Sequence, residues 1–114
     1  MALRCYFFDG KGRSTVFRGT TPTLKFTLPF DADRLSCAWI TLAQNKKDII
    51  DKPMTECTCA ENVITVTLTQ EETLLLNCDC KTEMQIRAKT VDGNALASKI
   101  FTVDTERILK DGEI

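Results

Sequence analysis

Two cysteine pairs are the residues whose types and spacing are best suited to chemistry. Cys57 and Cys59 form one Cys-x-Cys pair, Cys78 and Cys80 form a second, and 18 residues separate the two pairs. Because residues i and i+2 of an extended chain point to the same side, each pair could present two thiolates, and four thiolates complete a tetrahedral zinc site. Structural zinc sites more often use the Cys-x-x-Cys spacing, however, and acidic residues flank both pairs. We therefore expect reduced structural thiols, with a zinc site or a redox pair as the alternatives.

The sequence contains few residues suited to acid–base or nucleophilic catalysis. No histidine occurs among the 114 residues, which removes the commonest general base and every nucleophile–histidine pair. The paired acids Asp31 and Asp33 are explained by a solvated turn, and Glu71 and Glu72 by the start of a helix. We expect a protein that is not an enzyme and that binds no cofactor.

Charge and hydropathy exclude two further classes of protein. The chain carries 15 Lys and Arg against 16 Asp and Glu, a net charge of -1, which argues against a nucleic-acid binder that works by bulk charge. No stretch approaches the roughly 20 consecutive apolar residues of a membrane span. Residues 2–8 are too short for the apolar core of a signal peptide, so we expect a reducing compartment in which disulfides are disfavoured.

The elements that would position these residues follow from the alternation of apolar and polar side chains. Residues 23–28, 63–69 and 84–91 each alternate with a period of two, which predicts half-buried antiparallel strands. Residues 36–43 are apolar on both faces and predict a central strand. Trp39 is expected in the core, with a ligand-stacking aromatic as the alternative.

Turn and cap signals connect these strands. A polar loop after residue 43 predicts a hairpin to residues 49–52, and Pro53 suits an edge strand. Asp92-Gly93 predicts a second hairpin, which leads to a last strand near residues 98–103. Thr69 with Glu72 has the capping-box form and predicts about two helical turns that end before Asn77.

Together these signals predict an all-β fold: a two-sheet antiparallel sandwich, immunoglobulin-like, of about seven strands with one short helical turn near residues 70–76. The inter-sheet disulfide of antibody domains is not expected, because Cys37 shares a strand with Trp39 and the strand at residues 84–91 has no cysteine. We expect a sandwich domain over residues 14–104 and a C-terminal extension over residues 105–114. Residues 1–13 are either a leader or an N-terminal extension, and residues 5–8 could form a strand.

Four segments are more distinctive than the composition. They are Phe17–Asp31, with its Arg-Gly-Thr-Thr-Pro bend, Ala38–Gln44, Leu68–Thr73 and Glu106–Gly112, with its Glu-Arg-Ile-Leu-Lys-Asp-Gly run. In these segments the chain resembles a family of small proteins encoded in prophages of gut Firmicutes, which look like components of phage tails or baseplates. The likeness covers residues 16–114. Members of that family begin near the Arg-Gly-Thr-Thr-Pro segment, so residues 1–13 depart from it, and the cysteine pairs lie outside its pattern.

The resemblance implies a structural or adaptor protein of the tail or baseplate. Its expected partners are other phage structural proteins, with a homo-oligomer in the particle, and its expected location is the bacterial cytoplasm before assembly and the virion afterwards. Arg18, Arg107 and Lys110 are the candidate partner contacts, with a solvated or locally paired arginine as the alternative. A carbohydrate- or host-surface-binding sandwich is the alternative function, and a cysteine-based metal-binding protein is a further one.

Overall fold

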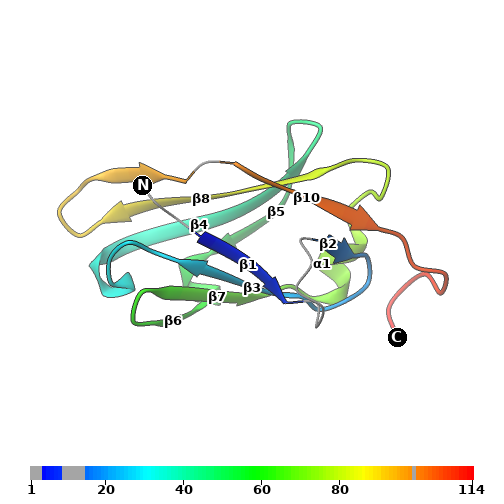
Figure 1. Ribbon diagram of the computed structural model, residues 1–114, viewed down its shortest axis with the longest axis horizontal. Coiled ribbons are helices and arrows are strands. Elements are labelled where there is room, and N and C mark those ends of the chain that lie inside the picture. Colours follow the sequence, from blue (N-terminus) through cyan, green and yellow to red (C-terminus); the bar gives the residue numbers. More distant parts are fainter. Residues whose placement is uncertain (1–3, 9–14, 99) are drawn as a thin grey trace.

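The computed structural model describes residues 4–8, 15–98 and 100–114, which form two β-sheets, seen as the lower and upper layers of Figure 1. The first sheet has the strand order β1 (Arg4–Phe8), β3 (Thr23–Thr27), β7 (Val63–Thr67) and β6 (Thr58–Ala60). The second has the order β2 (Thr15–Phe17), β10 (Phe101–Glu106), β8 (Thr82–Thr90), β4 (Leu35–Gln44) and β5 (Lys47–Pro53). A short strand, β9 (Ala95–Ala97), pairs with β8 beyond the end of β10.

This strand order is that of an immunoglobulin-like sandwich. Strands β1, β3, β7 and β6 correspond to A, B, E and D of that arrangement, and β10, β8, β4 and β5 correspond to G, F, C and C′. The pairs are antiparallel except for β2, which runs parallel to β10. The predicted all-β, two-sheet antiparallel sandwich is confirmed. Residues 5–8, for which a strand was one of two interpretations, lie in β1, which pairs with β3.

The core lies between the sheets and follows the predicted alternation. Among the side chains that the structure describes, seventeen apolar ones from β3, β4, β5, β7, β8, β10 and the connections between them form one buried cluster. The inward residues predicted for the alternating strands are all in it: Leu24, Phe26, Leu28, Ile64, Val66, Leu68, Met84, Ile86 and Ala88. Because the period of a strand is two, these residues share one face and their polar neighbours share the other.

The predicted core position of Trp39 was wrong. Strand β4 is central, since it pairs with both β8 and β5, but the Trp39 side chain points away from the core and is 47% exposed. Ala38, Ile40 and Leu42 take the inward positions of β4, and strand alternation then places the residues between them on the outer face. The sequence did not show which face of this strand is buried, because apolar residues occur on both of its faces.

The predicted hairpins are both present. Asn45 and Lys46 turn β4 into β5 with positive φ angles of 52° and 63°, and β5 is the edge strand that Pro53 suggested. Gly93, with a φ angle of 91°, lies in the turn after β8. The strand that follows it is interrupted, so β9 and β10 pair with opposite halves of β8.

The one α-helix in the described residues, α1 (Gln70–Leu74), begins at the predicted capping box. Thr69 Oγ1 accepts a hydrogen bond from the backbone N–H of Glu72, and the Glu72 side chain accepts one from the backbone N–H of Thr69. The helix has five residues and is therefore shorter than the two turns expected. No helix in the described ranges has the length and apolarity that a bilayer crossing requires.

Candidate functional site

The outer face of the second sheet carries a shallow hollow of about 590 Å³. Side chains of β4, β5 and β8 line it, and we call this surface the Trp39 face. Its main members are Cys37, Trp39 and Thr41 of β4, Asp51 of β5, and Gln85, Arg87 and Lys89 of β8.

Strand register places these side chains in rows across the sheet. Trp39 lies directly opposite Arg87 on β8, and Thr41 lies opposite both Gln85 on β8 and Asp51 on β5. Side chains that face each other in this way have Cβ atoms roughly 5 Å apart, so the Arg87 guanidinium lies within reach of the indole ring. Thr41 Oγ1 donates a hydrogen bond of 2.7 Å to Asp51 Oδ1 and holds that carboxylate against the sheet.

Charge is distributed unevenly over the Trp39 face. The β5 side carries the acids Asp48 and Asp51, the β8 side carries Arg87 and Lys89, and the exposed indole lies between them. Neighbouring tryptophan and arginine residues on an exposed face are typical of recognition surfaces, because these two residue types dominate the binding energy of many protein interfaces. The arrangement can bind a partner or ligand by stacking, hydrogen bonding and charge pairing.

The first cysteine pair has an unreactive member. Cys57 follows the 3₁₀ turn η2 (Met54–Glu56), and its Sγ donates to the Pro53 carbonyl oxygen at 3.5 Å. Burial, with a smaller contribution from nearby Cys59, raises the pKa of Cys57 to about 11. Cys57 is therefore a neutral thiol at physiological pH, and a neutral thiol is a poor nucleophile and a poor metal ligand.

The second cysteine pair lies in a different part of the fold. Cys78 and Cys80 are half-buried in the turn between α1 and β8, where Asn45 Nδ2 lies 3.2 Å from Cys80 Sγ. Cys59, by contrast, is exposed on β6 of the first sheet. In the parts of the chain that the structure describes, no three His, Cys, Asp or Glu residues are grouped to hold a metal ion. The two pairs therefore do not assemble the four-thiolate arrangement that their spacing suggested.

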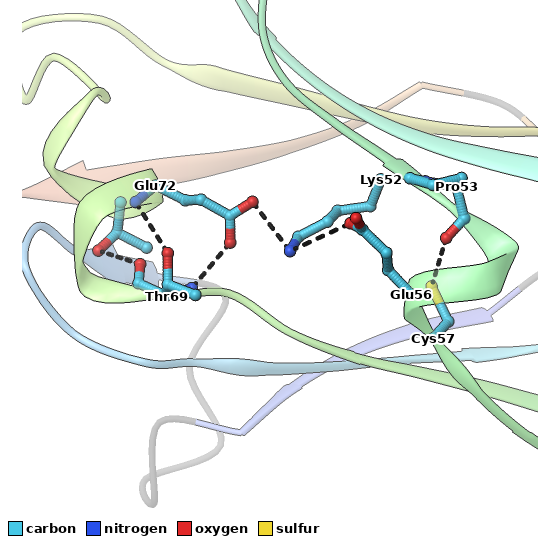
Figure 2. A network of polar contacts seen from close by, with 7 residues as sticks. Lys52, Pro53, Glu56, Cys57, Thr69 and Glu72 are labelled. Atoms are coloured by element: carbon cyan, nitrogen blue, oxygen red, sulfur yellow. Dashed lines mark hydrogen bonds and ion pairs between the residues drawn. The ribbon is translucent and has the colours of Figure 1, made fainter.

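Lys52 forms an ion-pair network that the sequence did not suggest (Figure 2). Its side chain is 12% exposed, and its Nζ lies 2.9 Å from Glu72 Oε2 and 3.6 Å from Glu56 Oε2. Burial opposes the charge on Lys52, but hydrogen bonds and charge attraction from Glu72 and Glu56 outweigh it and raise the pKa of Lys52. For Glu72, burial is likewise outweighed by bonds from Thr69 and Lys52, so the pKa of Glu72 is lowered.

This network joins the edge strand β5 to the start of α1. Lys52 and Glu72 lie on different elements and far apart in the sequence, so no local spacing could reveal their pairing. Only the capping role of Glu72 was visible in the sequence. We interpret the network as structural.

Arg18, a predicted partner contact, is directed into the molecule. Its Nε donates to the Leu76 carbonyl oxygen at 2.8 Å, and its Nη2 donates to the Leu74 carbonyl oxygen at 3.0 Å. Its Nη1 lies 3.4 Å from Asp111 Oδ1, and the side chain is 23% exposed. Arg18 therefore satisfies carbonyl groups at the end of α1. The other two candidates, Arg107 and Lys110, are exposed on the C-terminal segment.

The segment that follows Arg18 is packed against α1 and the C-terminal residues. Gly19 has a φ angle of +72°, and a Cβ atom added there would lie 2.8 Å from Ile108 Cδ1. Thr73 Oγ1 donates to the Thr20 carbonyl oxygen at 2.8 Å, and the Gln70 side chain exchanges two hydrogen bonds with the backbone of Ile114. We call this unit the Arg18 corner: residues 18–20, α1 with Leu75 and Leu76, and residues 108–114.

No protein-family model and no curated protein sequence matches the chain. The candidate sites are therefore the Trp39 face and the Arg18 corner. Of these, the Trp39 face was not the favoured prediction, because Trp39 was assigned to the core and a ligand-stacking role was only the alternative. The signal that could have revealed it is the run Ala38 to Leu42, in which aliphatic residues already occupy every inward position.

Proposed function

We propose that the protein is a non-enzymatic structural or adaptor component of a phage tail or baseplate, acting through protein–protein contacts. One observation carries the proposal: three of the four segments that carry the family resemblance meet in the Arg18 corner. Arg18 and Gly19 come from the first of these segments, Thr73 from the third, and Ile108 and Asp111 from the last. Residues 93 positions apart in the chain thus contact each other.

The packing in the Arg18 corner explains why these residues occur together. Arg18 needs the carbonyl groups of α1 as acceptors, and Gly19 provides the space in which Ile108 packs. The similarity therefore involves a tertiary unit, which supports a shared fold and, through it, the proposed role. The immunoglobulin-like sandwich adds exposed outer faces and edge strands, which suit an assembly module.

The setting follows from this proposal. The protein is made in the bacterial cytoplasm and becomes a part of the virion, where its partners are other phage structural proteins and further copies of itself. Arg107 and Lys110 remain the partner-contact candidates because both are exposed, whereas the guanidinium of Arg18 is already bound inside the molecule.

Deletion of the gene from its prophage tests the proposal. After induction, we expect particles with absent or incomplete tails by electron microscopy, and the wild-type protein detected in purified virions by mass spectrometry. Complementation with the double variant Arg107→Ala, Lys110→Ala should lower incorporation, while Lys81→Ala, at an exposed lysine just before β8, serves as the matched control. Normal tails without the gene, and no protein in the virion, would refute the proposal.

A saccharide-binding module is the second candidate function, favoured by the 47% exposure of Trp39 within a hollow. An exposed indole can stack on a sugar ring, while Asp51, Gln85 and Arg87 offer hydrogen bonds to its hydroxyl groups. Glycan-array binding that is lost in Trp39→Ala, with the thermal unfolding of the variant unchanged, would support this candidate. An array without signal for the wild-type protein would remove it.

A further inference from the structure

We propose that the Trp39 face is a homotypic docking surface, on which a second copy of this chain binds face to face about a two-fold axis parallel to β4. The inference rests on the proposed function and deepens it by naming one partner and the surface that receives it. The observations that carry it are the position of Trp39, the charge distribution around it and the area of the sheet.

The charge distribution selects the orientation of the second copy. The acid Asp51 lies on β5, the bases Arg87 and Lys89 lie on β8, and β4 with Trp39 runs between them. A two-fold axis along β4 places β5 of each copy over β8 of the other. Asp51 then lies over Gln85 of the second copy and diagonal to its Arg87, within reach of that long side chain, and this acid–base pair occurs twice. An axis across the strands would place β5 over β5 and bring like charges together, which costs affinity.

The same axis brings the two copies of β4 into contact along its outer side chains. Each Trp39 then faces its counterpart in the centre of the contact, where an aromatic side chain excludes water most effectively. Cys37, exposed on the same face of β4, likewise faces its counterpart. Face-to-face sheets lie about 10 Å apart, so the two Cys37 Cα atoms are too far apart for a direct disulfide, which requires less than about 7 Å.

The area of the face suits a weak, specific contact. Strands β4, β5, β8 and β9 have ten, seven, nine and three residues, and at a rise of about 3.4 Å per residue and a strand spacing of about 4.8 Å their joint face covers roughly 470 Å². Two such faces bury roughly 950 Å², which is the size of a weak, transient contact. We therefore expect a dissociation constant on the order of micromolar, strengthened by repeated copies in a particle.

One pair of like charges works against the contact. Asp48 pairs in register with Ala43 of β4, and Glu83 lies opposite Ala43 on the other side, so Asp48 of one copy approaches Glu83 of the other. Lys46, which lines the surface beside both acids, supplies a compensating positive charge from each hairpin. The attraction is therefore concentrated around Trp39, Asp51 and Arg87.

Sedimentation equilibrium of the full chain tests this inference. We expect a monomer–dimer equilibrium that weakens as salt screens the charges. Asp51→Arg and Arg87→Asp should each weaken the dimer about tenfold or more, and the double variant should recover most of the loss because the pair is then reversed in both copies. Trp39→Ala should also weaken it, with circular dichroism showing that each variant is folded.

Cross-linking gives an independent measure. A bismaleimide that spans roughly the 10 Å between packed sheets should trap a dimer through Cys37. The link should be lost in Cys37→Ser and kept in Cys59→Ser, because Cys59 is exposed on the other sheet.

Several outcomes would overturn the inference: a monomer at every concentration, a dimer insensitive to the Trp39 and charge variants, or a cross-link that survives Cys37→Ser. Saccharide binding at the Trp39 face of a chain that stays monomeric would overturn it in favour of a ligand site. Because incorporation into virions is measured separately, a failure of self-association leaves the proposed tail function standing. Absence from virions, in turn, leaves a measured dimer standing.

Discussion

Replacement of Arg18 by alanine provides the sharpest test of how the Arg18 corner is held together. The change leaves the carbonyl oxygens of Leu74 and Leu76 without the charged donor that now binds them at 3.0 Å and 2.8 Å. Leu76 is 1% exposed, so water reaches its carbonyl group poorly and the loss is not readily compensated.

The expected cost can be worked out from these contacts. A hydrogen bond with a charged partner contributes about 1.5–3 kcal/mol, and the two bonds share one partly exposed guanidinium, so we expect Arg18→Ala to lower the free energy of unfolding by about 3 kcal/mol. The ion pair with Asp111 adds little, because that carboxylate is 74% exposed and surface pairs contribute about 0–1 kcal/mol. For a domain of this size, the midpoint of thermal unfolding should fall by roughly 10 °C.

Two further variants separate the contribution of the hydrogen bonds to the carbonyl groups from that of the ion pair with Asp111. Arg18→Lys retains one donor group and should recover part of the loss, whereas Asp111→Asn should change the free energy of unfolding by less than about 0.5 kcal/mol. Urea denaturation followed by circular dichroism measures all three. The reasoning would be refuted if Arg18→Ala unfolded within about 0.5 kcal/mol of the wild type, or if Asp111→Asn were as costly as Arg18→Ala.

Three other predictions concern backbone strain, pH and thiol reactivity. Gly19→Ala should destabilise the fold more than Gly93→Ala: both glycines have positive φ angles, but only at Gly19 does an added Cβ meet a neighbouring atom, at 2.8 Å. Denaturation of the two variants side by side checks this, and equal costs would contradict it. The lowered pKa of Glu72 contributes stability that is present above its unfolded-state value of about 4.3 and is lost as the pH falls through the folded-state value. Glu72→Gln should therefore reduce the acid-induced loss of stability, and an unchanged acid limb in the stability–pH curve would count against the Lys52 network. Because burial raises the pKa of Cys57 to about 11, iodoacetamide at pH 8 should modify exposed Cys37 well before Cys57, as followed by peptide mass spectrometry; equal rates would show that the Cys57 thiol is not shielded.

Much of the sandwich was predictable from local patterns. Alternation over residues 23–28, 63–69 and 84–91 predicted the strands and the side of each that is buried, because a strand has only two faces. The capping box predicted where α1 begins, because both of its hydrogen bonds join residues three positions apart. The end of α1 was less predictable, since it depends partly on Arg18, which approaches from a distant segment.

The sequence by itself determined the alternating strands, the two hairpin turns and the start of α1, because alternation, turns and caps depend on residues within a few positions of each other. The tertiary structure decided the sites. Trp39 became exposed because three smaller aliphatic residues of β4 fill the core and nothing in the described structure covers its outer side. Arg18 donates to the carbonyl oxygen of Leu74 at the end of α1, 56 positions further along the chain. Lys52 pairs with Glu72 near the start of α1, 20 positions further along. Such contacts depend on how the two sheets and the helix pack, and no local spacing in the sequence records that packing.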